Sequence, residues 1–436
     1  MVGHSVWILM GLSIANGSAA LAEQAQSINQ AVPEIVALEP ELESVYKDLH
    51  EHPELAFHEQ RTAATLADRL RALGFDVTTQ VGGTGLVAIL RNGSGPVVML
   101  RTELDALPIE EKTGLPFASK AKGVNSEGKV VPVAHACGHD LHMTGWLGAA
   151  TIMAQRRTKW HGTLMMVGQP AEEITRGAAA MLADGLFTRF QKPDFAISMH
   201  DEPSLPSGKI GFHPGFFRAS SDAVDVTIFG HGGHGGKPQM TVDPVVLAAR
   251  AILGIQTIVS RETDPLSPAV VTIGSIHGGN AGNVIPDEVR MQMSVRTYDD
   301  KVRKRILSSI KRQLDAEAAA ADAPSPPSIK VTPGAEVVFN DPELTARVVD
   351  ALRQNLGTES VTEMPAKMTS EDFSEYGRAG VRTVLLHIGA VSPATLESGA
   401  KLPDLHSPQW FPELEPTLRS LVAAEVVMLM DLLAAQ

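Results

Sequence analysis

Short apolar segments that alternate with longer amphipathic stretches constrain the fold of this chain most strongly. GLVAIL (85–90), VVMLR (97–101), TLMMVG (163–168) and FAISMH (195–200) are mostly apolar, and stretches with helical periodicity, such as 142–155, precede or separate them. Runs of this length between helices are typical of strands that are buried on both faces of a parallel sheet. The sequence therefore predicts an α/β domain with a mainly parallel sheet.

A different order of elements begins near Ser221 and ends near Gly334. Half-buried strands and helices are expected there in the order β-α-β-β-α-β, which is that of a ferredoxin-like unit. The expected segments are 222–230, 244–258, 269–278, 289–299, 301–321 and 328–334. We therefore predict a two-domain α/β protein, with one domain in two pieces (33–218 and 334–436) and a smaller α+β domain inserted at 219–333.

The composition is typical of a soluble globular protein and not of a nucleic-acid-binding protein. With 436 residues, of which 44% are apolar and 20% charged, the chain is long enough for two domains. Its formal net charge of −13 and the lack of a basic stripe argue against a nucleic acid partner, because phosphate binding needs clustered Lys and Arg.

The N-terminal segment has two features of a signal peptide. Val6–Ala15 is a short apolar run, and Ala20-Leu21-Ala22 is a small-x-small cleavage site. The run is too short to span a bilayer, so no membrane partner is expected. Because no Lys or Arg precedes the run, a disordered or helical N-terminus is the alternative. We expect residues 1–22 to be removed and the protein to be exported, to a periplasm or outside the cell; a single cysteine suits such an oxidising compartment.

Metal-binding side chains gather in four short motifs, two of which directly follow predicted strands. The motifs are HACGHDLH (135–142), QPAEE (169–173), SMHDEP (198–203) and LHSP (405–408). Cys137 is the only cysteine in the sequence, so it is either a small buried hydrophobe or a metal ligand or nucleophile. Adjacent carboxylates such as Glu172 and Glu173 point in different directions, so one can bind metal while the other moves a proton. Ligands bind beyond the carboxyl ends of strands in open α/β sheets, which favours one shared metal site.

These motifs, together with GGH, NVIP and SEDF further along the chain, resemble the M20 metallopeptidases in content and order. The resemblance is to the amidohydrolase branch that includes hippurate hydrolases and plant indoleacetyl-amino-acid hydrolases, and it extends from His50 to His406. It implies two divalent metal ions per subunit, with zinc preferred and Mn, Co or Ni as alternatives. In this reading Cys137 bridges both ions, His139 and His200 complete one ion, Glu173 and His406 complete the other, and Glu172 is the general base.

The resemblance also assigns roles to the inserted domain, as a lid that dimerises. His234 would stabilise the oxyanion of the tetrahedral intermediate in the partner subunit, and Asn283 and Arg296 would hold the substrate carboxylate. A salt bridge at a strand end is the alternative for Arg296. A homodimer or higher homo-oligomer through the lid is expected.

The sequence departs from the family pattern at three places. Glu103 stands where the family has aspartate, and if that position orients the general base, its longer side chain is expected to reposition Glu172. Gln239 follows Pro238 where histidine is usual, and the segment KAKGVNSEGKVVPVA (120–134) is longer and more polar than usual. None of these removes a proposed ligand.

The predicted function is hydrolysis of the amide bond of an N-acyl-amino acid, with an aromatic acyl group or amino acid such as an N-aroyl-phenylalanine. Two alternatives remain. An exported, non-catalytic metal- or solute-binding protein would explain two domains and a signal peptide but not the additional carboxylate. A serine-type amidase is indicated only by S-x-x-K at Ser44–Lys47 and K-T-G at Lys112–Gly114, without the intermediate motif of that class.

Overall fold

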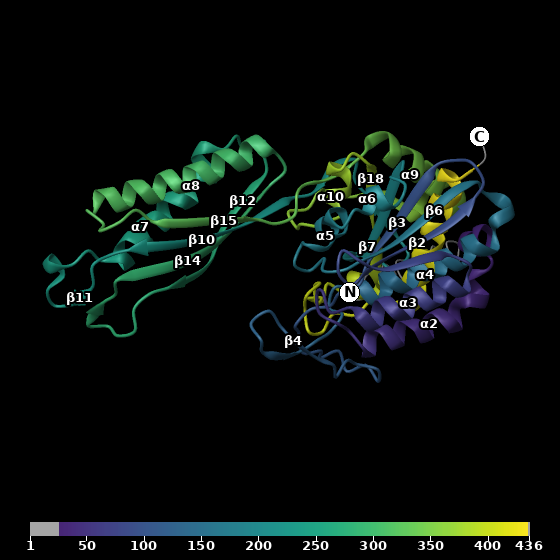
Figure 1. The fold of residues 1–436 in the computed structure, drawn as a ribbon, viewed down its shortest axis with the longest axis horizontal. Coiled ribbons are helices and arrows are strands. Elements are labelled where there is room, and N and C mark those ends of the chain that lie inside the picture. Colours follow the sequence, from purple (N-terminus) through teal and green to yellow (C-terminus); the bar gives the residue numbers. More distant parts are fainter. Residues whose placement is uncertain (1–25, 435–436) are drawn as a thin grey trace, which may run out of the picture. The chain divides into compact units, whose positions relative to one another are not determined.

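An eight-stranded sheet organises the larger of two units into which the chain divides (Figure 1). The computed structural model describes residues 26–434, so the expected signal peptide lies outside the described residues. The large unit comprises the chain up to Gly215, Phe339–Pro365 and the chain from Glu375 onward, and the small unit comprises Phe216–Val338 and Ala366–Ser374. The last of these segments was predicted as part of the α/β domain.

The sheet of the large unit is mainly parallel, which confirms the predicted fold class. Its strands, in spatial order, are β1 (Asp76–Val81), β2 (Gly85–Asn92), β6 (Gly162–Gln169), β3 (Val97–Glu103), β7 (Phe195–Pro206), β18 (Arg382–Val391), β8 (Ile210–Phe212) and β17 (Val361–Glu363). The central strands β6, β3, β7 and β18 are parallel to one another, and β1, β2 and β8 join the sheet through antiparallel pairs. Parallel central strands end at one edge of the sheet, where a site is expected.

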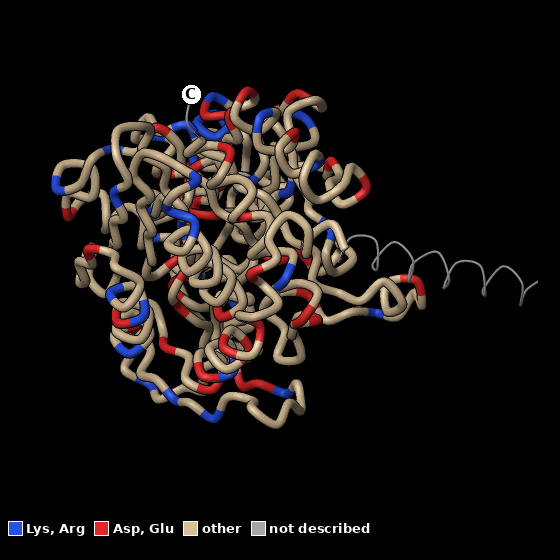
Figure 2. Tube along the Cα trace, turned by 90° about the vertical axis from the view of Figure 1, so that its right-hand side faces the viewer, with Lys and Arg blue, Asp and Glu red and all other residues tan. Residues whose placement is uncertain are grey.

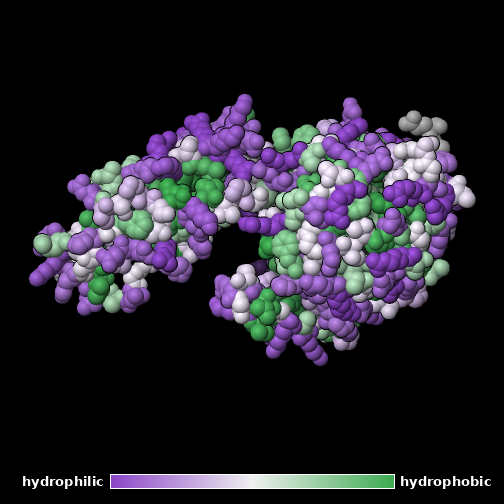
Figure 3. Space-filling model, in the orientation of Figure 1, coloured by the Kyte–Doolittle hydropathy of each residue, from purple (hydrophilic) through white to green (hydrophobic). Residues whose placement is uncertain are grey.

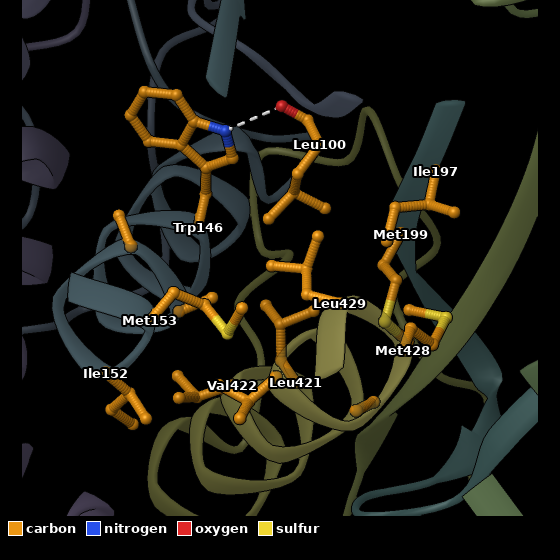
Figure 4. Packing of buried hydrophobic residues seen from close by; sticks show 14 of the residues in the cluster. Leu100, Trp146, Ile152, Met153, Ile197, Met199, Leu421, Val422, Met428 and Leu429 are labelled. Atoms are coloured by element: carbon orange, nitrogen blue, oxygen red, sulfur yellow. Dashed lines mark hydrogen bonds between the residues drawn. The ribbon is translucent and has the colours of Figure 1, made fainter. Parts of the chain in front are cut away.

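Helix α4 (His139–Gln155) is the central helix of the large unit. It packs against β3 and β7 and between α2 (Ile35–Glu51) and α12 (Leu414–Leu432). Two glycines allow α12 to approach closely, because a Cβ at Gly145 or Gly148 would lie 2.4 Å from Leu421 or 2.8 Å from Val422. Trp146 fills the core below and donates from Nε1 to the Leu100 carbonyl over 3.0 Å (Figure 4). The first turn of α4, which carries His139, is therefore held by a close-packed core.

The remaining elements of the large unit connect or flank these. The helices are α3 (Gln60–Ala72), α5 (Gly177–Ala183), α6 (Leu186–Arg189), α9 (Pro342–Leu356), α10 (Ser374–Arg378) and α11 (Pro393–Glu397). The polar segment 120–134 forms a hairpin of β4 (Lys122–Val124) and β5 (Val130–Pro132). The strands β9 (Gly215–Arg218) and β16 (Val338–Asn340) lie where the chain passes between the two units. Val124 and Val130 are exposed, which gives the hairpin a hydrophobic patch (Figure 3).

The small unit has the predicted ferredoxin-like order of elements. In the chain, β10 (Ser220–Phe229), α7 (Pro244–Thr257), β12 (Ala269–His277), β14 (Glu288–Thr297), α8 (Asp300–Ala320) and β15 (Ser328–Pro333) follow one another. The strands form an antiparallel sheet in the order β12-β14-β10-β15, which the two helices cover. Asp243 and Asp299 cap the two helices, each accepting from two backbone N–H groups of the first turn. Lys and Arg residues and Asp and Glu residues are interspersed along the Cα trace in Figure 2.

Candidate metal centre and active site

The structure brings the five predicted metal ligands together in the large unit. Cys137 lies in the loop before α4 and His139 is the first residue of that helix. Glu173 follows β6, His200 lies on β7 and His406 lies in the loop between α11 (Pro393–Glu397) and α12. The ligands thus come from the carboxyl-terminal side of parallel strands and the N-terminus of the helix that packs on them.

The ligand atoms form two groups that share one sulfur. Cys137, His139 and His200 form one group and Cys137, Glu173 and His406 the other, and within each group the ligand atoms lie within 4.8 Å of one another. Cys137 Sγ is 3.6 Å from His200 Nε2, and His406 Nε2 is 3.4 Å from Glu173 Oε2. This is the arrangement expected if one thiolate contacts two ions.

A buried histidine nitrogen without a hydrogen-bond partner, His139 Nε2, shows that these residues fit a cation. His139 Nδ1 is 2.8 Å from the Asp105 carbonyl oxygen, to which it donates, so Nε2 carries the lone pair. That Nε2 is buried without a hydrogen-bond partner, 3.8 Å from Glu172 Oε2 and 3.9 Å from Glu173 Oε1. Burial holds the pKa of His139 well below its usual range, so the ring is neutral and able to bind metal.

The thiol at the centre of the site needs a cation to ionise. Burial, with Glu173 nearby, raises the pKa of Cys137 well above its usual range in the absence of metal. A bound cation reverses this preference, because a coordinating thiol loses its proton. One sulfur, three imidazole nitrogens and one carboxylate form a donor set that suits borderline divalent ions such as zinc.

A buried carboxylate fixes the turn that carries the two adjacent glutamates. Asp105 accepts from the backbone N–H of Glu172 with Oδ1 and of Glu173 with Oδ2, both over 3.0 Å. The preceding residue, Ala171, has a φ of +52°, in the left-handed region that non-glycine residues rarely adopt. Sequence reasoning assigned no role to Asp105, although its place in the RTELDALP motif was visible.

Asp201 contacts residues beside both ligand groups, namely His200 and Trp410. His200 Nδ1 is 2.8 Å from the Asp201 carbonyl oxygen and 3.1 Å from its carboxylate, which leaves Nε2 free for a metal. Trp410 Nε1 donates to Asp201 Oδ2 over 3.1 Å, and Trp410 belongs to the loop that carries His406. A glycine is needed at position 138 beside Asp201, because the φ of Gly138 is +76° and a Cβ there would lie 2.5 Å from Asp201 Oδ2. One carboxylate thus orders parts of both ligand groups.

Glu103 contacts Arg101 and His142. It forms a buried ion pair with Arg101 and lies 3.1 Å from His142 Nδ1, while His142 Nε2 lies 3.2 Å from Asp201. Burial lowers the pKa of His142, but Glu103 and Asp201 outweigh this effect and raise it to about 10. Asp105 accepts from the two N–H groups of the turn that carries Glu172, and the expected effect of Glu103 on Glu172 stays a prediction.

The backbone at His406 is strained and tied to the thiol loop. Its φ is +65°, and its N–H donates to the Ala136 carbonyl over 2.7 Å, one residue before Cys137. Its side chain remains 55% exposed, in contrast to the buried His139 and His200. His406 is therefore the most accessible of the predicted ligands.

The other three predicted site residues lie in the small unit, at two separate places. His234 on β11 (Gly233–His234) is next to Asn283, whose carbonyl accepts from Gly235 over 2.8 Å, near the start of β14. Arg296 lies near the far end of β14, where it donates to the Met368 carbonyl over 2.9 Å. Among the described residues it forms no salt bridge, which was the alternative considered for it. Eight strand residues, or about 26 Å, separate these two ends.

An α/β sheet that collects a thiol, three imidazoles and two adjacent carboxylates at one edge defines the class of a metallohydrolase. The model of peptidase family M20/M25/M40 matches residues 99–406. The chain is 37% identical over 347 residues to a hippurate hydrolase of Campylobacter jejuni, covering 78% of this chain and 86% of that protein. It is 34% identical over 379 residues to an IAA-amino acid hydrolase of Arabidopsis thaliana, covering 85% and 82% respectively. The chain therefore belongs to the M20 peptidase family and is an amidohydrolase of that family.

Solved structures agree with this assignment. A putative aminohydrolase from methicillin-resistant Staphylococcus aureus has a TM-score of 0.81 at 29% identity, covering 93% of this chain and all of that one. A Bacillus subtilis protein described as a dinuclear metal binding peptidase from the M20 family has a TM-score of 0.73 at 30% identity, covering 90% and 98%. Two of the expectations, the family and the fold class, are thus confirmed.

Proposed function

We propose that this amidohydrolase cleaves N-acyl-amino acids in which the acyl group or the amino acid is aromatic, such as N-aroyl-phenylalanines. One observation carries the proposal of a hydrolytic centre: Glu173 shares a ligand group with Cys137 and His406, and the adjacent Glu172 lies beside that centre, with Oε2 3.8 Å from His139 Nε2. We assign Glu173 to metal binding and Glu172 to proton transfer. Two relatives are named for hydrolysis of hippurate and of IAA-amino acids, and two others, at 34% and 36% identity, for deacetylation of N-acetylcysteine.

Relative kcat/KM values on matched substrates test the choice of acyl group. We expect hippurate and N-benzoyl-phenylalanine to be hydrolysed faster than N-acetylcysteine and N-acetyl-phenylalanine. A preference for the acetyl compounds would contradict the aromatic acyl specificity and leave the amidohydrolase assignment intact.

The mechanism assigns each step to a side chain of the site. The two ions, when bound, polarise the amide carbonyl and lower the pKa of water. Glu172 takes a proton from the attacking water and delivers it to the amide nitrogen as the C–N bond breaks. His234 donates to the developing oxyanion, and Asn283 and Arg296 bind the substrate carboxylate.

Two divalent ions are proposed, with Cys137 shared, His139 and His200 on one ion, and Glu173 and His406 on the other. Zinc is preferred for the mixed sulfur and nitrogen donors, with Mn, Co or Ni as alternatives. Chelation should abolish activity, and addition of each metal to the apoprotein should restore it to different extents. Full activity of metal-free protein would contradict the proposal.

A homodimer is proposed because one small unit presents its functional residues at opposite ends. His234 and Asn283 lie before the start of β14 and Arg296 lies near its far end; eight strand residues, or about 26 Å, separate the two ends of β14, too far for one small substrate to touch both. A second subunit supplies the missing end. Helix α7 carries an exposed apolar face that consists of Val245, Val246 and Leu253. The helical segment Pro244–Glu262, which contains this face, is long and apolar enough to cross a membrane, and one-third of it is buried within the protein. Such a face is typical of a subunit interface.

Subunit mixing tests the shared site. His234→Ala and Glu172→Gln proteins are each expected to be nearly inactive, and mixed dimers should regain one complete site. No recovery after subunit exchange, confirmed by mass, would place His234 in its own subunit's site.

Both alternative functions have less support. Ser44 lies exposed on α2, and Lys47 pairs with Glu43 over 2.7 Å, so the S-x-x-K motif forms no serine site. A non-catalytic binding protein leaves the second carboxylate, Glu172, beside the proposed ligand Glu173 unexplained. Export to a periplasm or beyond stays a proposal, tested by cell fractionation and N-terminal sequencing of the mature protein.

A further inference from the structure

Glu59 is a fully buried carboxylate that is not among the metal ligands, and its contacts converge on the turn that carries Glu172. One oxygen, Oε1, accepts from the backbone N–H of Ala171 over 2.8 Å and of Phe57 over 3.0 Å. The other oxygen, Oε2, accepts from the Thr84 hydroxyl. A single side chain thus joins the loop before α3, the turn between β1 and β2, and the turn after β6.

The direction of this side chain is unusual for its position. Glu59 occupies the N-cap of α3 but makes no side-chain capping bond to that helix. Glu54 provides that capping instead, accepting from Arg61 N over 3.1 Å and from Thr62 N over 2.8 Å. The Glu59 carboxylate is therefore directed away from its own helix and toward Ala171.

The residue that Glu59 binds is held in a strained conformation. Ala171 has a φ of +52°, and a left-handed conformation costs a non-glycine residue about 1–2 kcal/mol. The next two N–H groups, of Glu172 and Glu173, are bound by Asp105 over 3.0 Å each. Three successive N–H groups of the turn are thus bound by two buried carboxylates. Strain of this kind persists only where the surroundings impose it, and it concentrates at functional sites.

We propose that Glu59 is a positioning residue for the general base, which it serves by holding Ala171 in the left-handed conformation. The turn sets the direction of the Glu172 side chain, and a displacement of about 1 Å at a reacting group can lower the rate a hundredfold. Asp105 anchors the N–H groups of both Glu172 and Glu173, whereas Glu59 binds Ala171, which adjoins Glu172 and lies two residues before Glu173, so we expect its loss to affect Glu172 more than the metal ligand. This inference rests on the proposed role of Glu172.

Glu54 provides a matched control for the test. It lies five positions earlier in the same loop and, like Glu59, accepts from two backbone N–H groups, but its bonds end at α3. Glu54→Ala should therefore lower the melting temperature and leave kcat of the folded enzyme unchanged. Glu59→Ala should lower kcat about ten- to hundredfold, with KM and the two metal ions per subunit retained. Glu59→Gln keeps an acceptor oxygen for Ala171 and should recover most of the lost kcat.

The expected pattern separates positioning from structural support. Unchanged kcat per folded Glu59→Ala enzyme would overturn the proposal, as would a loss of kcat that follows only from lost metal. If Glu59→Ala does not fold, Thr84→Ala and Thr84→Ser decide: the alanine variant should lower kcat with metal retained and the serine variant should not, and equal kcat in both would overturn the proposal.

Glu172→Gln distinguishes this inference from the function on which it rests. An inactive Glu172→Gln enzyme beside a fully active Glu59→Ala enzyme would overturn the positioning role alone. A fully active Glu172→Gln enzyme would overturn the proposed function itself.

Discussion

Replacement of Cys137 by serine should weaken the binding of both metal ions together. Cys137 Sγ belongs to both ligand groups, whereas His139 and His406 belong to one each of these two. Serine keeps the size of the side chain but offers a hydroxyl that is far more reluctant than a thiol to ionise. Each ion therefore loses one of its proposed protein ligands.

The size of the effect follows from the number of ligands lost. Removal of an outer-shell partner alone typically costs about 10- to 100-fold in metal affinity. Loss of a direct ligand should cost at least as much for each ion, which corresponds to roughly 1.4–2.7 kcal/mol per ion. For His139→Ala we expect a loss of this size at one ion and a smaller change at the other.

Metal titration of the apoproteins, followed by elemental analysis after dialysis against buffered metal, measures both affinities. Wild type should retain two ions, His139→Ala one, and Cys137→Ser fewer than either at the same free metal concentration. A Cys137→Ser protein with two tightly bound ions and normal turnover would refute the bridging role, and the thiol would then be a buried hydrophobe.

Two further predictions concern the surroundings of the site, and a third concerns a helix of the small unit. Burial lowers the pKa of His50, but hydrogen bonds to Asp140 and Glu111 outweigh this effect and raise the pKa to about 10. The stability that His50 contributes should therefore be complete below about pH 6.5 and be lost as the pH rises toward 10. Denaturant titrations at several pH values should show this dependence in the wild type and not in His50→Gln. Asp201→Asn should weaken metal binding about tenfold or more in competition titrations, and unchanged affinity would show that its contacts do not orient the ligands. Asp299→Ala removes the cap of α8 and should lower the free energy of unfolding by about 1 kcal/mol without changing kcat; a change in kcat would link this helix to catalysis.

Much of the fold was predictable because its segments are periodic. The apolar runs that became β2, β3, β6 and β7 are buried on both faces, as the short run lengths indicated. The order of elements in the small unit was equally visible, since alternating strands such as β10 bury every second residue. Ala366–Ser374 was predicted to belong to the α/β domain and groups with the small unit by its contacts, which an irregular segment does not announce through a periodic signal.

The ligand motifs were also visible, but the network beneath them was not. Asp201 and Trp410 are 209 positions apart, and their contact depends on how β7 and the loop before α12 meet. Glu103 could have been assigned better: Arg101 and Glu103 are two positions apart on β3, so they lie on the same face and pair with each other. Long-range partners of this kind follow from the packed structure and not from local pattern.

A comparison of Glu172→Gln with Glu173→Gln tests the central claim most directly, that adjacent carboxylates divide proton transfer from metal binding. The measurement is metal content and single-turnover rate on one N-acyl-amino acid, for both variants in parallel. We predict that Glu172→Gln keeps two ions and loses about a hundred- to ten-thousand-fold in rate, because glutamine cannot take a proton. Glu173→Gln should lose metal first. Full metal content in Glu173→Gln together with depleted metal in Glu172→Gln would reverse the two roles and contradict the account.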